Sequence, residues 1–234
     1  MKQTLTGCFA AAAFILAVSG PAKAMELQWF GQSAFKITTP GGKVIVIDPF
    51  ITNNPKTPKS LKDLSKLGKV DLILITHGHG DHIGDLAELA RMTGARVALN
   101  ADMGLTIASL GWVEPRKIIR FNKGGPIKPF GDKVTITMVR AEHSSAVRNI
   151  DPDTGKATML PGGEPAGYII EMEDGYKLYD AGDTDVFADM KYIAEYYKPD
   201  LALLPIGGHF TMDPAHAAYA IKTLLKTKTV VPMH

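Results

Sequence analysis

The segment ITHGHGDHIGD at residues 75–85 carries three histidines and two aspartates directly behind the apolar run VDLILI. A single glycine separates His77 from His79, so both imidazoles can face one side of a chain that stays extended after its strand. Asp81 and His82 would begin the following helix and face the same point. Imidazole and carboxylate together suit zinc, iron or manganese. Because an open catalytic zinc ion takes about three protein ligands, four candidates this close together favour two ions.

Each of these residues also has a purely structural interpretation when it is taken alone. Asp81 could serve only as a helix N-cap, and the histidines could belong to a solvated loop. The four residues nevertheless occur together at the carboxyl end of a strand whose apolar composition predicts burial. Their coincidence favours a metal site.

The elements that must position these ligands alternate between strand-like and helical patterns from Met25 onward. Strands are predicted at residues 27–30, 34–39, 43–48, 70–76, 95–100, 132–143, 166–173, 175–182, 199–209 and 228–234. Helices are predicted at residues 82–94, 185–198 and 214–227. The simplest architecture for this order is two β-rich halves packed sheet to sheet, with helices outside.

Two segments, 50–60 and 148–167, are rich in proline, glycine, asparagine and aspartate and are predicted as loops. The second is longer than an ordinary connection. It begins just after His143, so we expect it to lie over the metal pocket and to tune substrate choice.

The first residues have the three-part layout of a secretory signal: a lysine, an apolar run at residues 9–18 and small residues that end at Ala24. The run is shorter than the ~20 residues that span a bilayer, which argues against a membrane anchor. LTGC at residues 5–8 is similar to a lipoprotein box, but the apolar run follows Cys8 instead of preceding it. We therefore predict a signal peptide at 1–24, export to the periplasm and no stable membrane anchor after cleavage.

Composition restricts the chemistry of the mature protein. Cleavage would remove the single cysteine, so disulfides and thiolate metal ligands are excluded and the site must use nitrogen and oxygen. The chain has 26 basic and 24 acidic residues, and loss of Lys2 and Lys23 with the signal leaves 24 of each. Proteins that bind nucleic acid usually show a basic excess, so we expect no nucleic-acid partner.

The motif THGHGDH resembles the metal-binding motif of the metallo-β-lactamase superfamily. The similarity continues in family order through VIDPF (46–50), EHSS (142–145), AGDTD (181–185), IGGHFTM (206–212) and VPMH (231–234). Within the superfamily, the chain is most similar to uncharacterised metal-dependent hydrolases related to ascorbate-6-phosphate lactonase and to the phospholipase D that cleaves N-acyl phosphatidylethanolamines. The resemblance implies one hydrolase domain at 25–234. This domain should have an α/β fold, a four-layer αβ/βα sandwich of two β-sheets flanked by helices.

The resemblance also implies two divalent metal ions, with zinc expected and manganese or iron as alternatives. The ligands that it implies are His77, His79 and His143 for the first ion, Asp81, His82 and His234 for the second, and Asp183 as a bridge. Two ions ~3.5–4 Å apart would lower the pKa of a shared water from ~15.7 toward ~7 and supply a hydroxide nucleophile. The expected substrate is a small-molecule ester, lactone or phosphodiester.

The expected catalytic residues are Asp81 and His209. His209, in GGHF, either contacts the substrate or protonates a leaving group, and an ordinary loop position is the alternative. Asp48 matches an aspartate of the family that orients the histidine loop, although a strand-end turn residue would have the same place in the sequence. Gln32 occupies the position where relatives commonly have a histidine. That histidine is not a usual metal ligand, so the metals should be kept.

Two further functions are compatible with parts of the sequence. A metal-binding or sensing protein without turnover would retain the same ligands, and Gln32 is the feature that favours it. An RNA-processing nuclease of the same superfamily is opposed by the neutral mature charge and by the export signal. His234 is the last residue, whereas relatives continue past PMH, so we expect a truncated chain with a weaker second metal site. The sequence leaves the oligomeric state open.

Overall fold

The computed structural model describes residues 24–131 and 133–234. Residues 1–23, which hold nearly all of the expected signal peptide, lie outside this range, so export stays a prediction. Within the described ranges, no helix combines the length and the apolar character that crossing a membrane requires.

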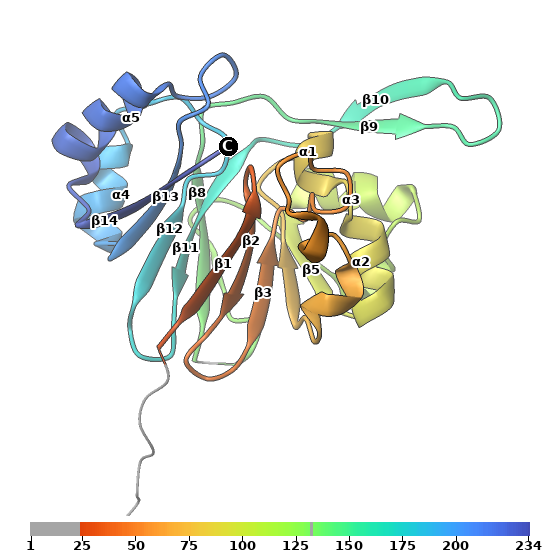
Figure 1. Cartoon of the computed structure of the whole chain (residues 1–234), viewed down its shortest axis with the longest axis horizontal. Coiled ribbons are helices and arrows are strands. Elements are labelled where there is room, and N and C mark those ends of the chain that lie inside the picture. The colour runs from red at the N-terminus through yellow and green to blue at the C-terminus, as the bar shows by residue number, and fades with distance from the viewer. Residues whose placement is uncertain (1–23, 132) are drawn as a thin grey trace, which may run out of the picture.

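Two six-stranded sheets form the centre of the molecule (Figure 1). The first sheet follows chain order: β1 (Glu26–Gly31), β2 (Ala34–Thr38), β3 (Val44–Ile47), β4 (Leu72–Leu74), β5 (Arg96–Asn100) and β6 (Ile118–Phe121). The second has the order β14 (Thr229–Met233), β13 (Leu201–Pro205), β12 (Lys177–Asp180), β11 (Ala166–Glu171), β8 (Thr135–Arg140) and β7 (Pro126–Ile127). In both sheets antiparallel pairs adjoin parallel ones: β3 to β6 run parallel, as do β12 to β14.

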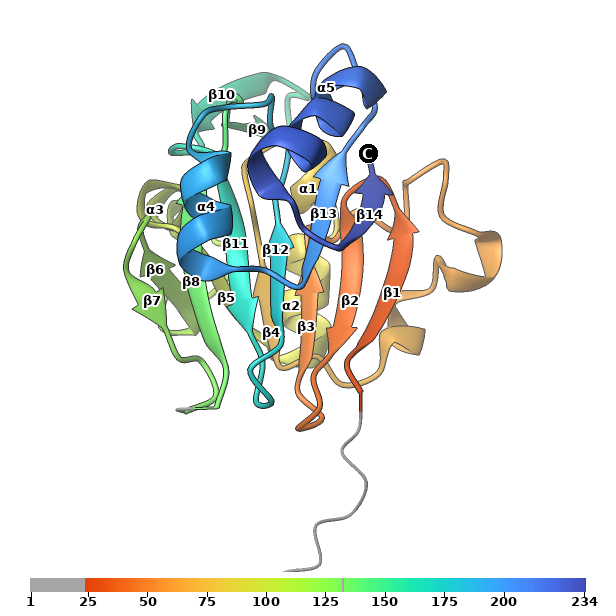
Figure 2. The same cartoon turned by 90° about the vertical axis from the view of Figure 1, so that its left-hand side faces the viewer.

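Helices cover the outer face of each sheet (Figures 1 and 2). Those beside the first sheet are α1 (Gly80–Ile83), α2 (Leu86–Thr93) and α3 (Ala101–Ser109). Those beside the second are α4 (Met190–Tyr197), α5 (Pro214–Tyr219) and the π-helix η4 (Ala220–Leu225). Short 3-10 helices are η1 (Lys59–Leu61), η2 (Leu64–Leu67) and η3 (Pro115–Lys117). The result is the four-layer αβ/βα sandwich that the sequence predicts.

Side-chain alternation along the strands separates three apolar layers. In β3, Ile45 and Ile47 face the opposite sheet, whereas Val46 packs toward α2 and α3. In β13, Leu203 faces the opposite sheet and Leu204 packs toward α4. Each fully buried side chain of this kind stabilises the fold by about 1.5–3 kcal/mol. Burial on both faces explains why these strands are nearly continuous apolar runs in the sequence.

The helix predicted at 82–94 is divided into α1 and α2. Asp85 leaves the helical conformation at φ −106° and ψ 7°, and its N–H donates to Pro49 O at 2.8 Å. Its carboxylate accepts the N–H groups of Ile51 at 2.5 Å and Thr52 at 3.0 Å. This contact with a distant loop interrupts the helix, so local periodicity did not reveal it.

The prediction that 148–167 is a loop was wrong, whereas its effect on substrate choice stays a prediction. The segment contains most of the hairpin formed by β9 (Ala146–Ile150) and β10 (Ala157–Pro161). Its turn residues lie at the hairpin tip, where Asp151 Oδ1 accepts the N–H of Thr154 at 2.8 Å, and in the connection 162–165 between β10 and β11. The hairpin extends outward beyond α1 and α3 (Figure 1), and Thr106 of α3 donates to Pro161 O at 2.7 Å.

Candidate metal centre

The seven predicted ligands come together although they belong to four separate segments. His77 follows β4, His143 follows β8, Asp183 follows β12, and His234 follows β14. The carboxyl ends of these strands meet at one end of the sandwich, where the loops can approach one another. The sheet order therefore assembles the site.

Three imidazoles make up the first group of candidate ligands, His77, His79 and His143, whose ring nitrogens lie within 4.8 Å of one another. His77 Nε2 is 2.9 Å from His79 Nδ1, which is 3.3 Å from His143 Nε2. Burial lowers the pKa of His77 well below its usual value, so this residue offers a neutral nitrogen. Neutral imidazole is the form that binds metal.

The second group of candidate ligands consists of Asp81, His82 and His234, again within 4.8 Å. His234 Nε2 lies 3.6 Å from Asp81 Oδ2, and His82 Nε2 lies 4.0 Å from Asp81 Oδ1. One carboxylate and two imidazoles form an all-nitrogen-and-oxygen donor set, which suits zinc, manganese or iron.

Asp183 lies between the two groups and is only 3% exposed. Its Oδ2 is 3.3 Å from His82 Nε2 and 3.1 Å from His234 Nε2 in the second group. The same oxygen is 3.9 Å from His77 Nε2 and 3.7 Å from His143 Nε2 in the first group. One carboxylate oxygen thus faces both groups, as a bridging ligand would.

Asp48 orients the histidine loop. Its Oδ2 is 2.7 Å from His82 Nδ1, which directs the opposite nitrogen of that ring toward Asp183. Its Oδ1 accepts the N–H of Thr76 at 2.8 Å, and its Oδ2 accepts the Thr76 hydroxyl at 2.6 Å. Asp48 is therefore more than a turn residue, because it fixes both the loop backbone and one imidazole.

Charges in the centre alternate between imidazoles and carboxylates. Burial disfavours a charge on His82, but Asp183 and Asp48 raise the pKa of its imidazole well above the usual value. The carboxylates of Asp183 and Asp81 raise the pKa of His234 to about 9. Burial opposes ionisation of Asp183, yet His82 and His234 hold its pKa far below the usual range. A metal ion at the second group would replace these protons as the positive charge.

The surroundings of two nitrogen atoms indicate whether the residues of this centre fit metal ions. His82 Nε2 and His234 Nε2 are buried, and each lies within ion-pair distance of Asp183 Oδ2, at 3.3 and 3.1 Å, outside regular hydrogen-bond geometry. Both atoms face the Asp183 carboxylate, and a divalent ion between them would satisfy nitrogen and oxygen together. The residues present therefore fit the metal ions.

Gln32 contributes to the centre through contacts that the sequence analysis did not predict. Its Nε2 donates to Asp81 Oδ2 at 3.2 Å across 49 residues of sequence. Its backbone carbonyl accepts the N–H of His234 at 3.1 Å. The turn that presents both groups is left-handed at Gln32, with φ 46°. Gln32 thus orients two members of the second group, and no local pattern signals such a contact.

We expect Gln32→Leu to weaken zinc binding at the second group about tenfold, within the range typical when a partner of a metal ligand is lost. Leucine approximates the size of glutamine but cannot hold Asp81. A two-step zinc titration against a competing chelator measures the effect, with exposed Gln28→Leu as the matched control. Equal weakening of both groups would contradict the assignment of Gln32 to the second.

A pocket of about 690 Å³ opens beside the second group. Asp81 and His234 line it together with Trp29, Phe50 and Phe210. The predicted loop at 50–60 contributes to this wall, as expected of a loop that shapes a site. We call this cavity the aromatic pocket. Its size is in the range of small-molecule sites, about 300–1,000 Å³.

His209 also lines the aromatic pocket but belongs to neither ligand group. Its side chain is exposed, its backbone is left-handed at φ 55°, and its ring centroid lies 4.3 Å from that of Phe210. The structure thus places His209 in the wall of the aromatic pocket, and its catalytic role stays a prediction. His216 is 59% exposed near Asp185 and Asp213, away from both groups.

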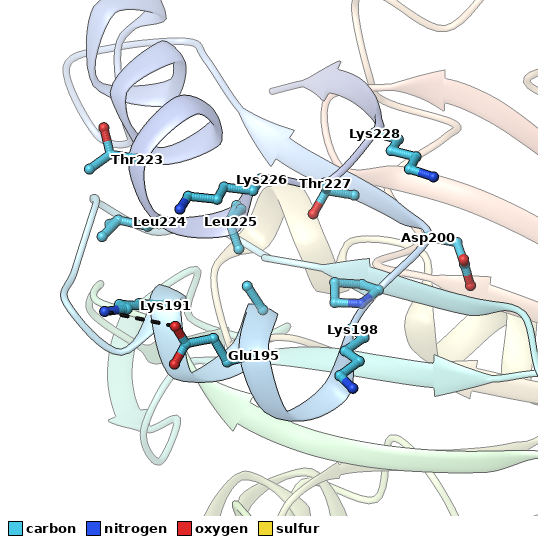
Figure 3. Close-up of a pocket in the computed structure, with 12 residues that line it drawn as sticks. Lys191, Glu195, Lys198, Asp200, Thr223, Leu224, Leu225, Lys226, Thr227 and Lys228 are labelled. Atoms are coloured by element: carbon cyan, nitrogen blue, oxygen red, sulfur yellow. Dashed lines mark ion pairs between the residues drawn. The ribbon is translucent and has the colours of Figure 1, made fainter.

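A different pocket, of about 360 Å³, lies between α4 and η4 (Figure 3). Lys198 and Lys228, which line it, precede β13 and β14, so it is at the opposite end of these strands from His234. Lys191 and Glu195, one turn apart on α4, form an ion pair at 3.7 Å beside it. No histidine lines this pocket, and it takes no part in the metal centre.

Fold and site together define a metal-dependent hydrolase with the metallo-β-lactamase fold. Residues 43–234 match the Beta-lactamase superfamily domain family, and the chain belongs to this family. A "UPF0173 metal-dependent hydrolase" of Polaromonas sp. strain JS666 is 52% identical over 235 residues, covering 100% of this chain and 86% of the relative. Another from Cupriavidus necator is 53% identical over 210 residues, covering 89% and 73%.

Solved structures agree with this assignment. Igni18, a metallo hydrolase from Ignicoccus hospitalis, superposes with a TM-score of 0.75 at 41% identity, covering 90% of this chain and 82% of that one. An isothiocyanate hydrolase from Delia radicum gut bacteria gives a TM-score of 0.63 at 19% identity, covering 89% and 84%, and is similar in fold alone. The closer relation to the lactonase and the phospholipase D stays a prediction.

Proposed function

We propose that this hydrolase is binuclear and acts on an ester, lactone or phosphodiester bond of a small molecule. The observation that supports two ions is the position of Asp183, whose single Oδ2 lies 3.1 to 3.9 Å from imidazole nitrogens of both groups. A mononuclear site would leave one group of three convergent ligands without an ion.

Bound divalent ions would supply Lewis-acid activation of water near neutral pH. The residues of the chain position that chemistry: Asp48 directs His82, and Gln32 directs Asp81. His209 is the residue we propose to protonate the leaving group, because it lines the aromatic pocket beside the second group.

Metal analysis combined with a substrate screen tests this function. The purified protein should take up two equivalents of zinc and hydrolyse 4-nitrophenyl acetate, a γ-lactone or bis(4-nitrophenyl) phosphate, with the β-lactam nitrocefin as a further arm. Chelation should abolish the activity and zinc should restore it. Saturation at one equivalent would refute the binuclear centre. Two bound ions with no turnover of any substrate would favour the metal-sensing alternative.

A further inference from the structure

We infer that the aromatic pocket binds an uncharged apolar group of the substrate, an aromatic ring or an acyl chain attached to the bond that is hydrolysed. This inference rests on the proposed function and specifies the substrate class. The pocket shares Asp81 and His234 with the second ligand group, so a group held there lies next to the metal centre.

The walls of the pocket expose large apolar side chains that the fold does not cover. Trp29 is 51% exposed and Phe210 is 71% exposed, and Phe50 joins them in the same cavity. Single exposed apolar residues are common on protein surfaces, but several that meet in one concavity beside a reactive centre mark a binding site.

The Trp29 ring and the backbone that carries Phe210 are held in place by contacts within the protein. The Trp29 indole N–H donates to Gln32 O at 2.8 Å, and its ring stacks on that of Phe35 with centroids 6.3 Å apart. Phe210 is in a tight turn in which its N–H donates to Gly208 O at 2.6 Å, and the N–H of Gly208 donates to Met212 O at 3.0 Å. Because the walls are preorganised, binding requires little additional ordering.

The charge of the pocket disfavours strongly anionic substrates. Lys56 is the single lysine or arginine among the lining residues, and Asp81 belongs to the ligand group. Nucleic acids and other polyanions are held through several basic side chains. The lining therefore favours apolar contact, with Lys56 as its one lysine or arginine side chain.

A binding experiment tests the inference without measuring turnover. In a Trp112→Phe background, Trp29 is the only tryptophan, so its fluorescence reports on the pocket. The zinc-loaded protein is titrated with phenylacetate, octanoate and acetate. Acetate measures the affinity that the carboxylate contributes without an apolar group. We expect phenylacetate or octanoate to bind at least about tenfold more tightly than acetate, because only these probes bury apolar surface.

Variants then locate the apolar contact. Phe210→Ala should reduce about fivefold the ratio by which phenylacetate or octanoate binds more tightly than acetate. Phe210→Tyr should retain that ratio. Tyr196→Ala is the matched control, because Tyr196 is an aromatic residue of α4 that is 67% exposed and does not line the pocket. A preference for phenylacetate identifies a ring, a preference for octanoate identifies a chain, and both support the inference.

Equal affinity for all three probes, or full retention of the preference in Phe210→Ala, would overturn the inference. Failure of the proposed function gives a different result, since tight probe binding by a protein that hydrolyses none of the screened substrates leaves the aromatic pocket in place and removes only the catalytic assignment.

Discussion

Replacing Asp183 by alanine is expected to lower kcat/KM at least about 1,000-fold, equivalent to about 4 kcal/mol of transition-state stabilisation. The reason is geometric, because Asp183 Oδ2 faces both ligand groups and lies 3.3 Å from His82 and 3.1 Å from His234. Without Asp183, the imidazoles of the first group and those of the second group would face each other with no carboxylate between them. The apolar layers of the sandwich do not depend on this side chain, so the fold should survive.

Metal content, circular dichroism and activity should be measured on the same Asp183→Ala preparation. Asp183→Asn retains the size of the side chain and removes its charge, which separates steric from electrostatic effects. Asp185→Ala is the control, because Asp185 is two residues away with a side chain that is 58% exposed. Unchanged turnover in Asp183→Ala with both metals bound would show that Asp183 is not the bridge.

Replacing Asp48 by alanine is expected to reduce the free energy of unfolding by about 3–5 kcal/mol, the usual cost of breaking a buried ion pair from one side. Asp48 is 1% exposed and pairs with His82 Nδ1 at 2.7 Å. Its removal also leaves the N–H and hydroxyl of Thr76 without their acceptor. Alanine would further occupy a left-handed backbone position, where φ is 44°.

Urea unfolding of the chelator-treated protein measures this effect independently of metal. Asp48→Asn should be milder, since asparagine tolerates the left-handed backbone and can still accept from Thr76. Asp71→Asn serves as the comparison, because Asp71 accepts the Val44 N–H at 3.0 Å at the opposite end of the β3–β4 pair. Equal stability losses for Asp48→Ala and Asp71→Asn would indicate that Asp48 contributes only as a turn residue.

Much of the fold was predictable because its elements depend on local properties. The apolar runs that contain β3, β4 and β13 are buried on both faces, and burial of that kind determines residue type directly. The helix at 82–94 was harder to predict, because the break at Asp85 depends on its hydrogen bonds with Ile51 and Thr52. The hairpin at 146–161 was missed because its turn residues dominated the composition of the whole segment.

By itself, the sequence determined most of the strands, the helical segments that contain α2, α4, α5 and η4, and the local ligand cluster from His77 to His82, whereas β6, β7, β9, β10 and α3 were not predicted. The family resemblance added His143, Asp183 and His234, which no spacing connects to that cluster. Only the tertiary structure decided that one oxygen of Asp183 faces both groups, that Gln32 holds Asp81, and that three aromatic residues meet beside the centre. The physical reason is that periodicity and burial act over a few residues, whereas these contacts depend on which strand ends the sheet order brings together.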